Sequence, residues 1–292
     1  MKFTKMHGAG NDYIYVNCLD NTFGGDDKAI LSDTALIGRI SERLSDRHFG
    51  VGADGIILIL PSDKADFRMR MFNADGSEGR MCGNATRCIG KLVFDNHFTD
   101  RTEITLETAS GVKYLTLHTG DDGKVSTVTV DMGEPVLVPA GIPVEAQENV
   151  DIPAVAAGQQ WILTAVSMGN PHGVVFVDEI TDELVHKVGP ALENHPIWPD
   201  RANIEFATVL PDGNLRMRVW ERGSGETMAC GTGACATAVA AMLTGRTPKS
   251  EVTVHLLGGD LTISWDRTTN HVYMTGPAVT VFEGDVNLQF RQ

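Results

Sequence analysis

Short runs in which apolar and polar residues alternate make up most of this chain. A period of two is typical of strands that bury one face, and turn residues between consecutive runs indicate antiparallel hairpins. The turns GDDG at 120–123 and PDGN at 211–214 each separate two such runs. The strands predicted in this way are 13–16, 56–60, 104–108, 112–119, 125–132, 161–166, 174–177, 203–210, 215–220, 252–257, 261–265, 271–275 and 279–282.

Helical spacing replaces this alternation in a few segments. From Ala85 onward the apolar residues fall at 85, 88, 89, 92 and 93, which is the spacing of one buried helical face. The segment 232–244 is rich in Ala and contains no charged residue, so we predict a helix that is buried on every side. Two further helices are expected, at 32–45 with Ser32 or Asp33 as N-cap, and around 181–188.

Each of the two stronger helices begins just after a cysteine. Cys82 precedes the first helix and Cys230 precedes the second. The first amide groups of a helix have no carbonyl partner inside it and carry part of the helix dipole. They can hold an anion and favour a thiolate, so both helix starts are predicted places for chemistry.

The two cysteine segments belong to an internal repeat with an offset of 148 residues. Phe72 matches Trp220, Glu78 matches Glu226 and Cys82 matches Cys230. Other pairs fall in the same order, namely GND at Gly10 with GNP at Gly169, Asp46-Arg47 with Asp200-Arg201, Gly111 with Gly259, and MGEPV at Met132 with TGPAV at 275–279. We therefore predict two domains, 1–131 plus 277–292 with Cys82, and 132–276 with Cys230.

The uncharged helix also predicts the architecture. It needs apolar cover on all sides, and the sequence around it is nearly all strand. The fold class expected is α+β, with two pseudo-symmetric domains that each wrap a curved, mostly antiparallel sheet around a central helix. If the two domains face each other, Cys82 and Cys230 stand on opposite sides of one cleft.

Composition limits the class of partner. The chain has 292 residues, which suits two domains, a formal net charge of -14 and five cysteines. An acidic chain without a basic stripe is not expected to bind nucleic acid or anionic membranes, so a small-molecule substrate is expected. The first residues contain no apolar leader, and no run approaches a membrane span, so a cytoplasmic location and free thiols are expected.

Two glycine-rich motifs suggest nucleotide binding and are rejected for it. Gly50, Gly52 and Gly55 match GxGxxG, but a β-branched run follows them where a dinucleotide fingerprint opens a helix. GTGACA at Gly231 does open a helix, yet no strand immediately precedes it. We expect a loop at the first motif and a bound carboxylate at the second.

Two opposed thiols suit one class of reaction. A thiolate can remove a proton from one face of a carbon while a thiol returns another to the opposite face, which inverts the stereocentre. The rival reading is a zinc site, but the spacings from Cys82 to Cys88 and from Cys230 to Cys235 fit four thiolate ligands poorly. We expect Cys88, Cys235 and Cys18 to be buried core residues.

Seven motifs together resemble the diaminopimelate epimerase family, in the family's order and over nearly the whole chain: MHGAGNDY, RHFGVGADG, FNADGSE, MCGNATRC, SMGNPH, ERGSGET and ACGTGAC. The resemblance implies a cofactor-independent, metal-free homodimer that interconverts LL- and meso-diaminopimelate for lysine and peptidoglycan synthesis. It implies Cys82 and Cys230 as the acid/base pair, supported by His172 and Glu221. The substrate-binding residues that it implies are Asn11, Asn73, Gly83, Asn84, Asn170, Asn203, Glu221, Arg222, Gly231 and Thr232.

These roles have plainer alternatives. Each asparagine suits a turn, Glu221 and Arg222 suit a surface pair, and His172 suits a structural hydrogen bond. The chain also departs from the resemblance, because it has Gly55 where many family members carry Gln and Ala85-Thr86 where Gly-Ala is commoner. Two rival functions stay open, a proline racemase-like enzyme and a redox or binding module in which the two cysteines form a disulfide.

Overall fold

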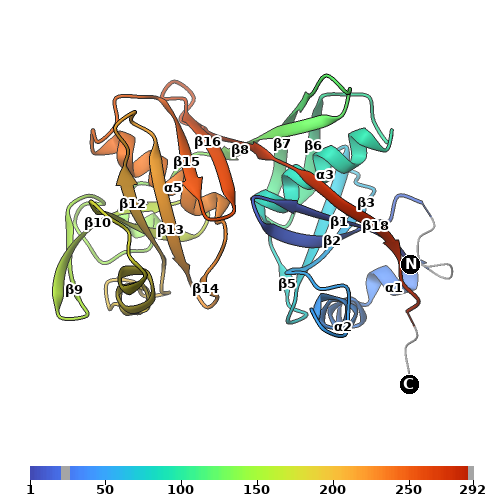
Figure 1. The fold of residues 1–292 in the computed structure, drawn as a ribbon, viewed down its shortest axis with the longest axis horizontal. Helices are drawn as coiled ribbons and strands as arrows, with labels where there is room; N and C mark the ends of the chain where they lie inside the picture. Colours follow the sequence, from blue (N-terminus) through green and yellow to red (C-terminus); the bar gives the residue numbers. More distant parts are fainter. Residues whose placement is uncertain (21–26, 289–292) are drawn as a thin grey trace. The chain divides into compact units, whose positions relative to one another are not determined.

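The structure, a computed structural model, describes residues 1–20 and 27–288. It divides into two compact units, Met1–Val130 with Gly276–Gln292, and Asp131–Thr275 (Figure 1). The domain bounds expected from the sequence differ from these by one residue at each crossing. None of the helices in the described ranges is long and apolar enough to cross a membrane.

The described residues of the first unit form a mixed sheet with three helices. Its strands pair in the order β18-β1-β2-β3-β4-β6-β7-β8, with the short β5 on β4, and only β2–β3 and β4–β6 are parallel. Its elements are β1 (Lys2–Gly8), β2 (Asn11–Asn17), α1 (Asp27–Ser32), α2 (Thr34–Ser45), β3 (Gly55–Leu60), β4 (Phe67–Asn73), β5 (Glu78–Gly79), α3 (Gly83–Asp95), β6 (Glu103–Thr108), β7 (Gly111–Thr119), β8 (Val125–Gly133) and β18 (Val279–Asp285).

The second unit repeats this plan. Its strands pair in the order β9-β10-β11-β12-β13-β15-β16-β17, with β14 on β13, and β11–β12 and β13–β15 are again parallel. The repeat in the sequence is therefore a repeat of the fold. Its elements are η1 (Pro139–Gly141), β9 (Ile152–Ala156), β10 (Gln159–Ser167), β11 (Pro171–Phe176), the π-helix η2 (Leu184–Val188), α4 (Gly189–Glu193), β12 (Asn203–Val209), β13 (Leu215–Glu221), β14 (Gly225–Glu226), α5 (Gly231–Leu243), β15 (Glu251–Leu256), β16 (Gly259–Trp265) and β17 (Val272–Pro277).

Helix α3 packs closely against the strands of the first unit. It contacts β1, β2 and β7, and its apolar face is buried as the sequence spacing predicts (Figure 1). Gly90 lies where the helix approaches β7, because a Cβ atom there would be 2.7 Å from Leu117 Cδ2. The contact therefore depends on the missing side chain.

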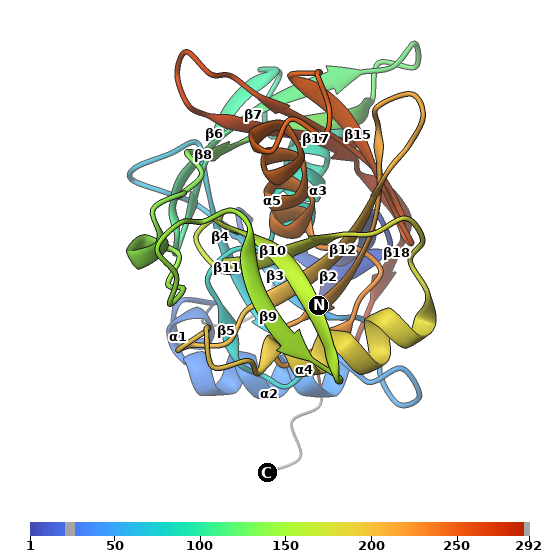
Figure 2. The same cartoon turned by 90° about the vertical axis from the view of Figure 1, so that its left-hand side faces the viewer.

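Helix α5 is surrounded by strands of the second unit. It contacts β10 to β13, β15 and β16, and Figure 2 shows these strands around it. The run 233–241 is buried throughout, which confirms the prediction of a helix covered on all sides, and only Thr232 and the last turn are partly exposed. Small Ala side chains let the helix lie close to several strands at once.

The remaining helices confirm the sequence predictions in part. The helix predicted at 32–45 is α2, and Asp33 Oδ1 caps it by accepting from the backbone N–H of Leu36 at 2.9 Å. The short α1 before it was not predicted. The helix expected around 181–188 is present and extends beyond it, because η2 continues directly into α4.

Candidate functional site

The first candidate half-site is built on the start of α3. Cys82 is the N-cap residue, with extended backbone angles of φ -134° and ψ 120°, and its side chain is half-buried. Its carbonyl accepts from the backbone N–H of Thr86 at 2.9 Å and from the Thr86 hydroxyl at 3.0 Å. Gly83, the first helical residue, is also buried. The helix start therefore fixes the cysteine backbone firmly.

Asn11 and Asn84 lie beside this cysteine, as the sequence predicts for substrate-binding residues. Asn11 Oδ1 accepts from Cys82 Sγ at 3.2 Å and from Asn84 Nδ2 at 3.3 Å. Asn11 Nδ2 donates to Asp54 Oδ2 at 2.7 Å. The three predicted residues therefore form one hydrogen-bonded group, and Asp54 extends it.

A cluster of charges that sequence reasoning missed supports Asn11. Arg47 Nη2 lies 2.9 Å from Asp12 Oδ1 and 3.0 Å from Asp54 Oδ1, and Lys5 Nζ lies 2.5 Å from Asp12 Oδ2. Burial opposes the charge of Asp12, but hydrogen bonds from Arg47 and Lys5 outweigh it and lower its pKa. Burial and the neighbouring Asp12 raise the pKa of Asp54. The matching Asp46-Arg47 segment was the only signal in the sequence.

Two other positions of the first unit, Asn73 and Gly55, differ from what the resemblance implies. Asn73 ends β4 and donates to Ser77 Oγ at 2.9 Å, which is a turn interaction. Gly55 pairs with Asn73 across β3 and β4, and a Cβ atom there would lie 2.1 Å from the carbonyl oxygen of Phe72. This close approach explains why position 55 of this chain is Gly. A larger residue needs a shifted backbone.

The second candidate half-site is built on the start of α5. Cys230 is the N-cap residue, and its buried sulfur accepts from the backbone N–H of Gly233 at 3.4 Å and lies 3.5 Å from Thr232 Oγ1. Burial raises the pKa of the Cys230 thiol well above its usual range, and the carboxylates of Glu221 and Glu205 act in the same direction. The hydrogen bonds from Thr232 and Gly233 oppose this shift. At neutral pH the thiol form therefore dominates.

His172 links this cysteine's surroundings to a buried carboxylate. His172 Nδ1 lies 2.6 Å from Glu205 Oε1, and neither side chain is exposed to solvent. His172 Nε2 lies 3.0 Å from Asn170 Oδ1, and Asn170 Nδ2 donates to Thr232 Oγ1 at 3.4 Å. Sequence reasoning missed Glu205. The signal that could have found it is a single acidic residue inside the apolar strand β12.

Glu221 ends β13 and Arg222 follows it, and Asn203 begins the neighbouring strand β12. Burial raises the pKa of the Glu221 carboxyl, although it accepts a short hydrogen bond from the Thr227 hydroxyl. Asn203 Oδ1 accepts from the backbone N–H of Arg222 at 2.9 Å, and Arg222 Nη1 donates to the Asp200 carbonyl at 2.8 Å. Glu221 is thus half-buried and pairs with Thr227, whereas the guanidinium of Arg222 is bound to backbone.

The other three cysteines are buried and free, as predicted. Cys88 lies in α3, Cys235 lies in α5 and Cys18 follows β2. Burial raises the pKa of Cys88 to about 11. The thiol of Cys88 is therefore protonated at neutral pH, and all three cysteines are core residues.

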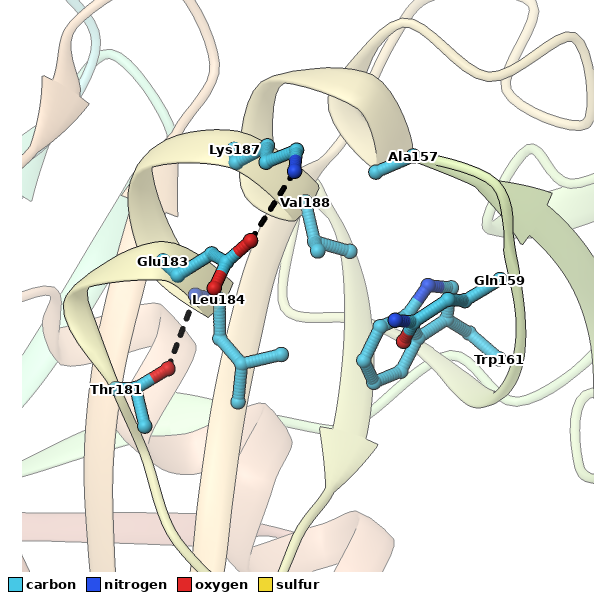
Figure 3. Close-up of a pocket in the computed structure, with 8 residues that line it drawn as sticks. All are labelled: Ala157, Gln159, Trp161, Thr181, Glu183, Leu184, Lys187 and Val188. Carbon is cyan, nitrogen blue, oxygen red and sulfur yellow. Dashed lines mark hydrogen bonds and ion pairs between the residues drawn. The ribbon is translucent and has the colours of Figure 1, made fainter.

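A small cavity lies away from both helix starts. It measures about 120 Å³ and is lined by residues of η2 together with Trp161 and Gln159 (Figure 3). An ion pair joins Lys187 Nζ to Glu183 Oε1 at 3.1 Å on its rim. None of the predicted site residues lines this cavity.

The family model that describes diaminopimelate epimerase matches residues 3–138 and 164–281. The chain belongs to the diaminopimelate epimerase family. The protein is accordingly an isomerase of the epimerase type. The match extends over both cysteine segments and both copies of the repeat.

Relatives match over nearly their whole length. A diaminopimelate epimerase of Agathobacter rectalis is 52% identical over 99% of this chain and 100% of its own. One of Phocaeicola vulgatus is 53% identical, with 99% of each chain covered.

Solved structures of lower identity share the fold. A probable proline racemase of Agrobacterium radiobacter has a TM-score of 0.71 at 17% identity, with 99% of this chain and 93% of that chain covered. A hydroxyproline epimerase of Agrobacterium vitis has a TM-score of 0.68 at 16% identity, with 98% of this chain and 90% of that chain covered. These similarities confirm the α+β fold of two related domains for this member of the epimerase family.

Proposed function

We propose that this epimerase interconverts LL- and meso-2,6-diaminopimelate, with Cys82 and Cys230 acting on opposite faces of one α-carbon. The observation that carries the proposal is that each unit presents one free cysteine as the N-cap of a helix, α3 or α5. The identity of about 50% to diaminopimelate epimerases over the full length supports the substrate. The reaction belongs to the synthesis of lysine and of peptidoglycan precursors.

In each direction one sulfur removes the α-proton as a thiolate and the other donates a proton as a thiol. The bond from carbon to hydrogen breaks on one face, its electron pair stays on carbon as a carbanion, and a new bond to hydrogen forms on the other face. No cofactor enters this scheme. Afterwards the two thiols have exchanged roles, so the enzyme must redistribute one proton before the next turnover in the same direction.

The carbanion has to be stabilised by positive charge that is already in place when the proton is removed. The backbone amides at the starts of α3 and α5, at Gly83, Asn84, Gly231 and Thr232, are proposed to bind the carboxylate next to the reacting carbon. Two helix N-termini carry partial positive charge, which stabilises the electron pair as it delocalises into that carboxylate. This use of helix amides requires no metal.

The other predicted residues are proposed to recognise the rest of the substrate. Glu221 accepts from the reacting ammonium group, and His172 acts on the ionisation of Cys230. Arg222 is proposed to exchange its backbone contact for the distal carboxylate, which its planar fork fits in a bidentate manner. The amides that complete the binding set are those of Asn11, Asn73, Asn170 and Asn203.

The origin of the new proton tests the two-thiol mechanism. In deuterium oxide, with both thiols exchanged beforehand, early product should carry deuterium at the inverted carbon while unreacted substrate keeps protium. Cys82→Ala and Cys230→Ala should each abolish epimerisation, with proline as the control substrate that the enzyme should leave unchanged. Product that retains substrate-derived protium contradicts two separate bases. Turnover of proline in place of diaminopimelate contradicts the substrate assignment.

A homodimer and a cytoplasmic location belong to the same proposal. The exposed face of β18 carries three apolar side chains, Val279, Val281 and Phe282, and a second copy of this chain is the partner that we propose for it. All five cysteines are free, which suits a reducing compartment. Sedimentation should show a dimer for the native enzyme and a shift towards monomer for Val281→Asp. A native enzyme that sediments as a monomer contradicts the proposal.

A further inference from the structure

The buried guanidinium of Arg87 lies one turn into α3, behind Cys82. Its side chain has no exposed surface. Arg87 Nη2 donates to Asn84 Oδ1 at 2.9 Å, Nε donates to the Pro277 carbonyl at 3.3 Å, and Nη1 lies 3.5 Å from the Gly83 carbonyl. A buried cation is costly, so a residue that is held in this way calls for an explanation.

The hydrogen bonds of Arg87 fix the direction of a chain that ends at the cysteine. A guanidinium can only donate, so the Asn84 atom that faces it is the carbonyl oxygen and the other atom is the amide nitrogen. That nitrogen donates to Asn11 at 3.3 Å, so the Asn11 atom there is again an oxygen. At the far end Asn11 donates to the Asp54 carboxylate at 2.7 Å, which requires the same orientation.

The sulfur of Cys82 contacts this chain at its shared acceptor. Asn11 Oδ1 takes one hydrogen bond from Asn84 and one from Cys82 Sγ, at 3.2 Å. We propose that Arg87 is a positioning residue for Cys82, because it orients the Asn84 amide and, through Asn84, the oxygen of Asn11 that faces the reactive sulfur. The proposal rests on the function proposed above only in the identity of Cys82 as a reactive thiol.

The surrounding structure leaves room for this arrangement. A Cβ atom at Gly8 would lie 3.0 Å from Arg87 Nη2 and 3.1 Å from the Asn84 carbonyl, so the neighbouring strand β1 carries no side chain there. The second unit has different residues at the matching positions. With the repeat offset, Cys235 stands at the position of Arg87 and Thr232 at that of Asn84, and His172 holds the asparagine beside Thr232. The arginine thus belongs to one half-site only.

The effect of removing Arg87 on the ionisation of Cys82 has a predictable direction. Without it Asn84 can turn away, Asn11 Oδ1 loses one donor and accepts more strongly from the Cys82 thiol, and a cation near the helix start is lost. Both effects favour the thiol over the thiolate. We expect Arg87→Gln to slow iodoacetamide alkylation of Cys82 about tenfold at pH 7.5, which corresponds to about one pKa unit upward. The kcat should fall by a similar factor, and KM should change less.

The experiment follows alkylation of both cysteines by peptide mass spectrometry across pH 6 to 10 in the full-length enzyme. Cys230 is the internal reference and should react as in the native protein. Arg87→Lys keeps the charge but cannot form the planar fork, so it should also slow Cys82, by a smaller factor than Arg87→Gln. Arg101→Gln, which removes an exposed arginine, should match the native protein. Equal slowing of both cysteines, or an unchanged Cys82 profile in Arg87→Gln, overturns the proposal.

A double-mutant cycle separates positioning from a charge effect through space. In the Asn84→Ala background Arg87→Gln should change the Cys82 alkylation rate less than about twofold, since the amide through which it acts is absent. Full additivity overturns the proposal. If Arg87→Gln does not fold, the test uses Arg87→Lys alone, because a lysine cannot form the planar fork. A Cys82 alkylation profile of Arg87→Lys that is identical to the native one then overturns the proposal. None of these readouts requires diaminopimelate to be the substrate.

Discussion

The buried carboxylate of Glu205 should control the ionisation of Cys230. A Cβ atom placed on Gly233 would lie 2.7 Å from Glu205 Oε1 and 3.3 Å from Cys230 Sγ. The oxygen and the sulfur are therefore at most about 6 Å apart, and at an effective dielectric constant of about 20 two unit charges at that distance repel by about 3 kcal/mol. This energy corresponds to about two pKa units on the thiol.

Glu205→Gln removes the repulsion and keeps the shape. The hydrogen bond between Glu205 and His172, at 2.6 Å, offsets part of the effect of the carboxylate, so about one unit is the expected change. The sign is downward, because a thiolate that no longer faces this carboxylate is easier to form. At a pH below the pKa, alkylation of Cys230 should therefore become about tenfold faster, and Cys82 should be unchanged.

Glu205→Gln should also slow catalysis. The carboxylate orients His172, and an amide accepts the same hydrogen bond more weakly, so we expect kcat to fall about tenfold while Cys230 becomes more reactive towards iodoacetamide. The matched control is Glu183→Gln, which removes an exposed carboxylate of the same unit that pairs with Lys187. A Cys230 profile that stays in place or moves to higher pH refutes the reasoning, as does a control that shifts equally.

Three further predictions address single residues. Arg222→Lys should raise KM for diaminopimelate at least about tenfold, since an ammonium cannot form the bidentate fork, and unchanged kinetics would remove Arg222 from the site. The pKa of Glu221 is raised in the folded protein, so the ionised carboxylate destabilises the fold above its unfolded pKa. The difference in melting temperature between Glu221→Gln and the native enzyme should therefore be more favourable at pH 7.5 than at pH 4. The opposite trend contradicts the raised pKa. Gly90→Val should lower stability by about 1–3 kcal/mol through collision with Leu117, and an unchanged melting curve contradicts the close packing.

Much of the fold could be predicted because its elements have strong local signals. The alternating runs and the two helix spacings identify most strands, α3 and α5, and the 148-residue offset indicates the repeat. A helix was predicted around 181–188, but the π form of η2 could not be, since its wider turn has no characteristic spacing in the sequence. The four parallel strand pairs were also beyond reach, because they join segments far apart in the chain.

The candidate residues could be named from the resemblance, but their partners could not. Asp54 and Glu205 lie next to site residues in space because of strand pairing, and the sequence gives no measure of that proximity. The environment of Cys230 shows the limit clearly. A helix start alone favours a thiolate, whereas burial and two carboxylates reverse the shift and raise its pKa.

The two half-sites share a scaffold and differ in the polar groups that face the sulfur. Cys82 donates to Asn11, whereas Cys230 accepts from Gly233 and lies near buried carboxylates. In an exact repeat the two thiols would have equal proton affinities. Duplication therefore supplied the pair of helix starts, and later substitutions around each cysteine set its proton affinity separately.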